Sequence, residues 1–239
     1  MAEPDVKTYG NFIANQWTGA AGGGHIAVRD PSTGEEFARL ARGGAEDVDL
    51  AARAARAALT GAWGRLTAAE RGRMLGRISA AVLRDIEPLS ELEARDVGKP
   101  LTQARADVVA LARYFEFYGG AADKVHGDTI PYQNGFTVLT LYEPHGVTGH
   151  IVPWNYPMQI LGRSLGAALA MGNAAVVKPA EEACLTILEF ARIAEAEGLP
   201  AGALNVVTGY GAEAGAALAG HADVNHISFT GSVRTGEMV

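Results

Sequence analysis

Four segments of the sequence place polar or small residues directly after a short apolar run, and their residue types suit different parts of a dinucleotide. The first is Pro153-Trp-Asn-Tyr-Pro157, which follows the apolar run 147–152. A proline at each end stiffens the backbone and removes two N–H donors. The turn therefore presents the Trp154 indole and the Asn155 carboxamide on a rigid support. Taken alone, the alternative is a proline-rich surface loop.

The second segment carries a lysine and a glutamate after the apolar run 174–177. Lys178 is one of only four lysines in the chain, and it follows a run apolar enough to be buried on both faces. A buried ammonium needs an anion or a polar cleft, because its desolvation is costly. Glu181 can reach the same cleft, where a carboxylate would accept hydrogen bonds from both ribose hydroxyls and repel a 2′-phosphate. The alternative is a Lys–Glu ion pair at a helix start.

Glycines mark the third and fourth segments. Gly209-Tyr-Gly-Ala-Glu-Ala-Gly215 has the spacing GxGxxxG, not the GxGxxG fingerprint, and it follows the third apolar run. Phe229-Thr-Gly-Ser232 precedes a predicted helix, where backbone N–H groups and a serine hydroxyl suit a phosphate. Each signal is weak alone, because glycines at a strand–helix joint often serve only packing. Together, the four segments predict one dinucleotide site.

Strands and helices that alternate from residue 146 onward would hold these four segments at one edge. Short apolar runs predict strands at Val147–Val152, Ala174–Val177, Leu204–Val207 and His226–Phe229, with helices at about 158–171, 184–197 and 212–219 between them. This alternation predicts an α/β fold with a Rossmann-like parallel sheet and flanking helices. In such sheets, ligands bind just beyond the carboxyl ends of the strands.

The upstream residues predict three further regions. Residues 9–40 favour a small β-hairpin region laid on a larger body, with a turn at Asp30-Pro-Ser-Thr-Gly34. Residues 45–120 favour a helical layer of four helices, one of which begins at the capping box Thr67-Ala-Ala-Glu70. Residues 127–143 favour an apolar hairpin around Asn134-Gly135. Either the rest of the chain or another subunit must cover that hairpin.

Composition narrows the class of protein. Apolar residues make up 48% of the 239 residues, and the net charge of −7 argues against nucleic-acid binding. No apolar run reaches membrane-spanning length, and the N-terminus lacks an apolar signal region. The single cysteine, Cys184, forbids an internal disulfide and favours a reducing compartment, so we expect a cytoplasmic protein. The six histidines have no metal-binding spacing, so we expect no metal site.

At these motifs the chain resembles the NAD(P)-dependent aldehyde dehydrogenase superfamily. The resemblance rests on Pro153–Pro157, Val177-Lys-Pro-Ala-Glu181, Gly209–Gly215 and Phe229–Ser232, and it extends upstream through Gly98-Lys-Pro100 to the Asp30–Gly34 turn. It implies NAD-dependent oxidation of an aldehyde to a carboxylic acid through a cysteine thiohemiacetal and a thioester. The substrate would be a small molecule that carries an aldehyde group, and neither a nucleic acid nor a membrane would be a partner.

The resemblance also implies a role for each matched residue. Asn155 corresponds to the catalytic asparagine, whose amide would donate to the oxyanion of the thiohemiacetal. Lys178 and Glu181 would hold the adenosine ribose, and Glu181 would favour NAD over NADP. Trp154 and Ile151 would contact the cofactor. The full set of implied cofactor-binding positions is Ile151, Val152, Pro153, Trp154, Lys178, Pro179, Ala180, Glu181, Gly211, Gly215, Phe229, Thr230, Gly231 and Ser232.

The implied organisation has three parts: residues 1–123 begin the cofactor-binding domain, 124–145 form an oligomerisation hairpin, and 146–239 form the Rossmann-like core. The hairpin implies a homodimer or homotetramer.

The family's nucleophilic cysteine and general-base glutamate lie beyond Val239, and Cys184 occupies a position that the family does not use for chemistry. We therefore expect an incomplete polypeptide that alone does not oxidise aldehydes. The alternative is a non-catalytic dinucleotide-binding or interaction module that ends at Val239.

Overall fold

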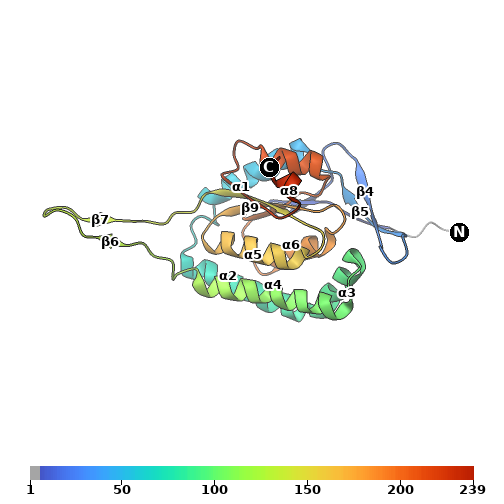
Figure 1. Ribbon diagram of the computed structural model, residues 1–239, viewed down its shortest axis with the longest axis horizontal. Helices are drawn as coiled ribbons and strands as arrows, with labels where there is room; N and C mark the ends of the chain where they lie inside the picture. The colour runs from blue at the N-terminus through green and yellow to red at the C-terminus, as the bar shows by residue number, and fades with distance from the viewer. Residues whose placement is uncertain (1–5) are drawn as a thin grey trace.

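The computed structural model describes residues 6–239 and places a six-stranded sheet between layers of helices (Figure 1). Residues 1–5 lie outside the described part of the chain. They include the start of the predicted segment 1–123 and of the N-terminal stretch whose sequence lacks an apolar signal region. Within residues 6–239, no helix combines the length and the apolarity that crossing a membrane requires.

The sheet confirms the predicted parallel core. Its strands lie in the order β11-β8-β9-β10-β2-β3. The first four run parallel to one another, and they are β8 (Val147–Val152), β9 (Ala174–Pro179), β10 (Leu204–Val206) and β11 (His226–Phe229). All four carboxyl ends therefore lie at one edge of the sheet. β9 is longer than predicted, so that Lys178 lies within the strand instead of after it.

The N-terminal strands do more than form a hairpin on the surface. β2 (Asn11–Ile13) pairs antiparallel with β10, and β3 (Gln16–Thr18) pairs with β2, so this hairpin extends the main sheet. β1 (Lys7–Tyr9), β4 (His25–Arg29) and β5 (Glu36–Ala41) form a second, three-stranded sheet. The predicted turn at 30–34 joins β4 to β5. Local turn signals cannot reveal that β2 pairs with a strand far along the chain, so the expectation was incomplete.

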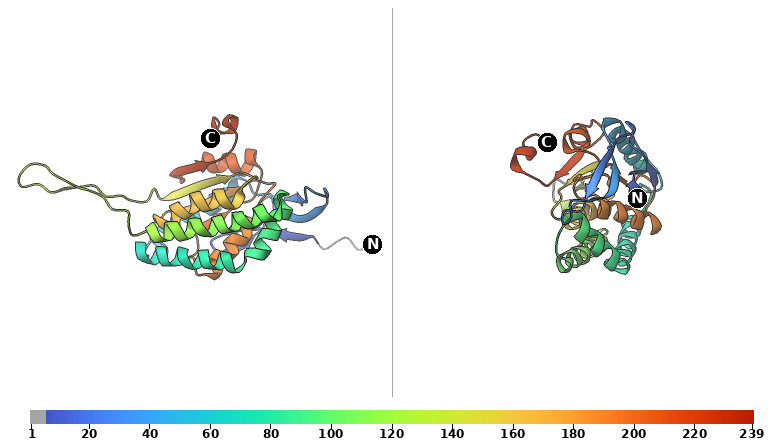
Figure 2. Two further views of the ribbon diagram at one scale, coloured as in Figure 1. Left: turned by 60° about the horizontal axis from the view of Figure 1, so that its bottom comes forward. Right: turned by 90° about the vertical axis from the view of Figure 1, so that its right-hand side faces the viewer.

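Helices cover both faces of the sheet. α5 (Pro157–Ala170) and α6 (Leu185–Ala196) lie on one face, and α1 (Ala45–Thr60) and α7 (Ala216–Ala219) lie on the other (Figure 1). An outer layer packs against α5 and α6 (Figure 2) and consists of α2 (Ala68–Arg84), α3 (Ile86–Val97) and α4 (Leu101–Ala121). The predicted capping box starts α2: Thr67 Oγ1 accepts from the Glu70 N–H at 3.3 Å, and Glu70 Oε2 accepts from the Thr67 N–H at 2.8 Å.

The segment after β10 differs from the single helix predicted over 212–219. It begins with a wide π-type turn, η1 (Gly211–Gly215), in which the Gly215 N–H donates to the Tyr210 carbonyl at 3.4 Å, and only then continues as α7. Gly209 is required by a close approach, because a Cβ there would lie 2.4 Å from the Gly43 carbonyl oxygen. The last helix, α8 (Val233–Gly236), follows β11 as expected.

Residues 124–145 leave the body as a long arm (Figures 1 and 2). Gly135 has φ +85°, which supports the predicted Asn-Gly turn. Only β6 (Thr129–Ile130) and β7 (Val138–Leu139) pair with each other, so most of the expected strand character over 127–143 is missing. The physical reason is that a two-stranded ribbon with nothing packed on it is only marginally stable.

Candidate active site

The register of the sheet brings the predicted site residues together. Phe229 on β11 lies beside Ile151 on β8, and Ile151 lies beside Lys178 on β9, so one row crosses three strands. The residues that follow are also linked. The Thr230 N–H donates to the Ile151 carbonyl at 3.2 Å, and the Ala180 N–H donates to the Val152 carbonyl at 2.8 Å. Three of the four predicted segments therefore start from adjacent points at the edge of the sheet.

The turn after β8 presents an indole and a free carboxamide. Val152 and Pro157 are buried and anchor the turn at both ends, and Pro157 begins α5 at a position where a missing N–H costs nothing. Trp154 is 56% exposed, and Asn155 is exposed as well. Within residues 6–239, the Asn155 side chain has no hydrogen-bond partner. Its amide is therefore available to a ligand or to a reacting oxygen.

Lys178 and Glu181 form a tight pair at the end of β9. Lys178 is only 3% exposed, and its Nζ lies 2.8 Å from Glu181 Oε2. Burial raises the pKa of Glu181. The hydrogen bond and the charge of Lys178 lower it, as do the backbone N–H groups of Glu181 and Gly211. Together these contacts outweigh burial, so the pKa of Glu181 is lower than its usual value. Glu181 is therefore an anion at neutral pH. A quarter of its side chain is exposed, so it can also accept hydrogen bonds from outside.

The glycine segment lies over this pair. The Gly211 N–H contributes to the low pKa of Glu181, and a Cβ at Gly215 would lie 3.9 Å from Lys178 Cδ. A Cβ at Gly211 would meet no atom within 4 Å, so the space above it is open. The third predicted segment thus joins the second around the Lys178–Glu181 pair.

In the fourth segment, Phe229–Ser232, the Phe229 ring restricts which residue fits at position 231. A Cβ at Gly231 would lie 2.4 Å from the Phe229 ring, so only glycine fits there. Ser232 caps α8, with its Oγ accepting from the Thr235 N–H at 3.2 Å. The hydroxyl that the sequence suggested for a phosphate therefore already has a partner, and the whole of α8 is exposed.

A cavity of about 680 Å³ touches the site from one side. Its lining includes Trp154, Glu181 and Tyr210, together with β4 and Asp96. Lys178 and the Phe229–Ser232 turn are not part of the lining, so the cavity overlaps only one side of the predicted dinucleotide site. The involvement of β4 and Asp96 was not predicted, since nothing in their local sequence marks them as neighbours of β9.

Asp96 is a buried carboxylate that the sequence did not single out. Its Oδ2 accepts from the Leu185 N–H at the start of α6 at 2.9 Å, whereas Oδ1 has no partner within residues 6–239. Burial raises the pKa of Asp96 to about 7. Its protonation state therefore changes close to neutral pH.

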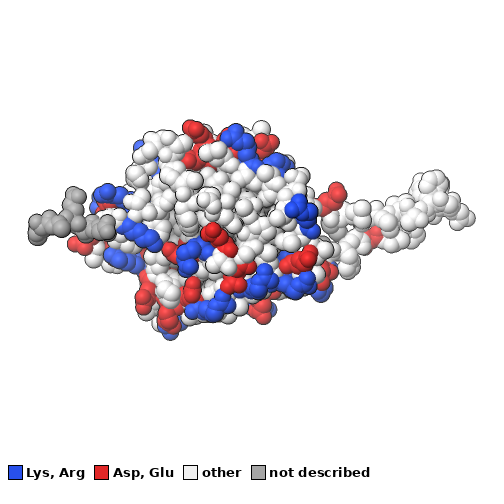
Figure 3. Space-filling view, turned by 180° about the vertical axis from the view of Figure 1, so that it is seen from behind, with Lys and Arg blue, Asp and Glu red and all other residues white. Residues whose placement is uncertain are grey.

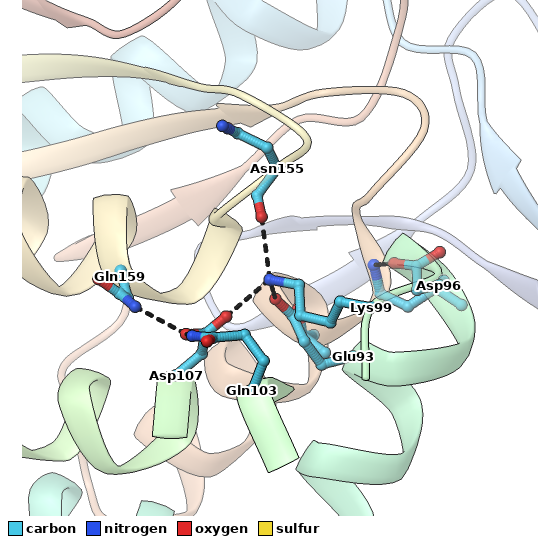
Figure 4. Close-up of polar contacts among 9 residues, drawn as sticks. Glu93, Asp96, Lys99, Gln103, Asp107, Asn155 and Gln159 are labelled. Carbon is cyan, nitrogen blue, oxygen red and sulfur yellow. Dashed lines mark hydrogen bonds and ion pairs between the residues drawn. The ribbon is translucent and has the colours of Figure 1, made fainter. Parts of the chain in front are cut away.

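Lys99 is the second residue that the sequence did not single out, because the Gly98–Pro100 segment predicts only a turn. Gly98 has φ +75° and ends α3, which directs the chain so that Lys99 lies beneath the turn after β8. Its Nζ lies 2.9 Å from the Asn155 carbonyl oxygen (Figure 4). The resemblance covered this residue, but neither its charge nor its spacing shows which turn it contacts.

Cys184 is not placed for chemistry, as expected. It is fully buried and donates to the Ala180 carbonyl at 2.9 Å. Burial raises the pKa of this thiol well above its usual value. The described residues 6–239 also contain no group of three or more side chains that could hold a metal ion. The site therefore supplies an amide donor, an ion pair and open space above a glycine, but no nucleophile.

Comparison with known proteins places these features in a family. The profile of the aldehyde dehydrogenase family matches residues 17–239. Hydroxyisobutyraldehyde dehydrogenase from Mycolicibacterium austroafricanum is 45% identical over 228 residues, which is 95% of this chain and 45% of that protein. The chain spans about half the length of the curated relatives it matches.

Two solved structures share the fold. A candidate aldehyde dehydrogenase from Burkholderia cenocepacia superposes with a TM-score of 0.95 at 66% identity, over 96% of this chain and 48% of that one. The NAD+ complex of an aldehyde dehydrogenase from Bacillus cereus superposes with a TM-score of 0.95 at 36% identity, over 99% of this chain and 50% of that one.

Proposed function

Because this chain belongs to the aldehyde dehydrogenase family, we propose that the complete protein oxidises an aldehyde to a carboxylic acid with NAD as the hydride acceptor. This chain would supply the NAD site and the amide that stabilises the oxyanion. The observation that carries the proposal is the row Phe229–Ile151–Lys178, which brings three of the four predicted segments to one edge of the sheet. The chemistry of the substrate beyond the aldehyde group is left open.

The residues at this edge fit a dinucleotide. Glu181 is an anion with a partly exposed carboxylate, and Lys178 keeps it in place at 2.8 Å. Such a carboxylate can accept from both hydroxyls of the adenosine ribose, whereas it would repel the 2′-phosphate of NADP. The open space above Gly211 leaves room for the adenine and pyrophosphate region, which the Phe229–Ser232 turn would also line. When bound, NAD supplies the acceptor for the hydride.

Asn155 would act on the reacting oxygen. A thiolate that adds to the aldehyde carbon forms a C–S bond and moves the C=O electron pair onto oxygen, and the free Asn155 amide would donate to that oxyanion. One such donor lowers the barrier by roughly 3 kcal/mol in comparable sites. Loss of the hydride leaves a thioester, and water then releases the carboxylic acid and the thiol. The thiolate must come from residues outside this chain, because Cys184 is the only cysteine and is buried.

The test is NADH formation by the complete polypeptide, with and without aldehyde. We expect aldehyde-dependent NADH production that Asn155→Ala slows by about a hundredfold or more at the chemical step, with little change in NAD affinity. The 239-residue chain alone should bind NAD, which would quench Trp154 fluorescence, but produce no NADH. Turnover by this chain alone, or an unchanged rate in Asn155→Ala, would contradict the proposal.

We further propose that the protein is a homodimer or homotetramer in which the arm 124–145 lies between subunits. The support is the exposed apolar surface of the arm, where Leu141 is 80% exposed and Phe136 and Tyr132 are each 67% exposed. In the space-filling view the arm carries few charged side chains, whereas the body is covered with both signs (Figure 3). An arm with exposed apolar side chains and few charges is suited to burial against protein.

The division into residues 1–123, 124–145 and 146–239 is likewise a proposal. Its support is that the arm leaves the body after α4, which ends at Ala121, and returns before β8, which begins at Val147.

We also propose a reducing compartment, the cytoplasm, because the only thiol is buried and unpaired. Some relatives are named as mitochondrial proteins. Fractionation of the native cells distinguishes the two locations.

A further inference from the structure

We propose that Lys99 is a positioning residue for Asn155: its ammonium holds the main-chain carbonyl of Asn155 and thereby sets where the turn presents the Asn155 amide. The inference rests on the proposed function, because it gives Lys99 a role only if the Asn155 amide acts in the reaction. Lys99 itself touches neither substrate nor cofactor in this account. It acts through the backbone of the turn.

All three donors of the Lys99 ammonium are used. Nζ lies 2.9 Å from Glu93 Oε1, 2.6 Å from Asp107 Oδ2 and 2.9 Å from the Asn155 carbonyl oxygen (Figure 4). A lysine has three N–H donors and no acceptor, so three acceptors satisfy it and fix its direction. The Lys99 side chain is 9% exposed, and both carboxylates are fully buried. This geometry is that of a fixed support, unlike the loose geometry of a surface ion pair.

Between its buried ends at Val152 and Pro157, the turn has few polar contacts that hold its backbone. Proline at positions 153 and 157 removes two of its N–H donors. Within residues 6–239, Lys99 makes the only side-chain hydrogen bond to the backbone between Pro153 and Tyr156. The same ammonium lies 4.8 Å from the centre of the Tyr156 ring, which adds a second contact to the turn. Lys99 is therefore the side chain, among residues 6–239, that hydrogen-bonds directly to the Asn155 backbone.

The two carboxylates are themselves held by the helices that follow β8 and β9. Asp107 Oδ1 accepts from Gln159 on α5 at 2.6 Å and from Gln103 at 2.8 Å. Glu93 Oε2 accepts from the Thr186 hydroxyl on α6 at 2.7 Å. Since α5 begins at Pro157, two residues after Asn155, the cluster links the turn to the helix that follows it and to α6. Every carboxylate oxygen in the cluster has a partner.

The charge of Lys99 is retained in this buried setting. Burial pulls the pKa of Lys99 down, but the charges and hydrogen bonds of Glu93 and Asp107 outweigh it and raise that pKa above its usual value. Removing the ammonium would leave two buried carboxylates facing each other without a cation, which is strongly destabilising. A test by substitution must therefore separate misfolding from loss of position.

A double-mutant cycle makes that separation in the complete protein. The variants are Lys99→Met, Asn155→Ala and their combination. If Lys99→Met does not fold, Lys99→Met with Glu93→Gln and Asp107→Asn takes its place, since it removes all three charges at similar volume. Lys7→Met, which removes an exposed lysine on β1, is the matched control. The readouts are the rate of the chemical step at saturating NAD, the NAD dissociation constant and amide exchange over residues 153–160.

We expect the Lys99 substitution to slow the chemical step by about ten- to a hundredfold, since small displacements of a catalytic group have effects of that size. In the Asn155→Ala background it should slow the step by less than about twofold, because no amide is left to position. NAD affinity should stay within about twofold, amide exchange over 153–160 should accelerate, and Lys7→Met should change none of these.

Equal losses in both backgrounds, or no loss at all from the Lys99 substitution, would overturn this inference and leave the proposed function intact. An unchanged rate in Asn155→Ala would overturn the role of Asn155 and this inference with it. The two failures are therefore distinct.

Discussion

At the scale of single residues, Lys178 shows how a charge can lie inside an apolar strand. It is 3% exposed on a strand whose six residues are all buried, yet Glu181 pairs with it three residues later. The pair costs desolvation energy and gives little net stability, as buried ion pairs often do. The pair therefore adds little to folding, and its proposed role is to hold the Glu181 carboxylate for a ligand.

Asp96 leads to a prediction about pH. Its folded-state pKa is raised from 3.8 to about 7, so the folded state binds the proton more tightly than the unfolded state does. The resulting stability is fully present below the unfolded pKa and is lost as pH rises through about 7. We expect the free energy of unfolding of the wild type, minus that of Asp96→Asn, to fall by roughly 3 kcal/mol at most between about pH 5 and pH 8.

The measurement is urea unfolding of both proteins across that range. Asn keeps an oxygen for the Leu185 N–H, and every other titrating group is common to both proteins, so the difference isolates Asp96. A difference that does not change with pH would show that Asp96 titrates as an ordinary carboxyl group.

At the scale of elements, the local patterns predicted most helices and strands because their signals are local. β8 and β11 have the predicted bounds, and Thr67 starts α2 through its capping box. The wide turn η1 and the second sheet of β1, β4 and β5 were missed. Both depend on packing between distant segments, such as the approach of Gly209 to Gly43.

The arm 124–145 gives the prediction at this scale. Leu141→Asp in the complete protein should weaken subunit association, because a charge would replace one of the most exposed apolar side chains on the arm. Light scattering after size-exclusion chromatography should show a smaller species at unchanged NAD affinity. Leu83→Asp, at an exposed apolar position on α2, is the matched control and should leave the mass unchanged. An oligomer of unchanged mass in Leu141→Asp would argue against the arm as the interface.

At the scale of the whole molecule, the parallel order of strands was predictable because alternating β and α segments allow few topologies. The adjacency of Ile151 and Lys178 followed from that order. The contacts of Lys99 did not follow from the strand order, because they join Glu93, Asp107 and Asn155, which lie on segments with unrelated local sequences. The polar contacts that hold a site in position therefore required the structure.

The central claim is that the edge formed by β8, β9, η1 and β11 is the NAD site, with Glu181 at the adenosine ribose. The most direct measurement is the ratio of NADP to NAD dissociation constants for the complete protein and for Glu181→Gln, with Glu182→Gln as the neighbouring control. We predict that NAD binds more tightly to the wild type and that Glu181→Gln narrows the ratio by about tenfold, since it removes the charge that repels a 2′-phosphate. An unchanged ratio in Glu181→Gln, or an equal change in Glu182→Gln, would contradict the claim.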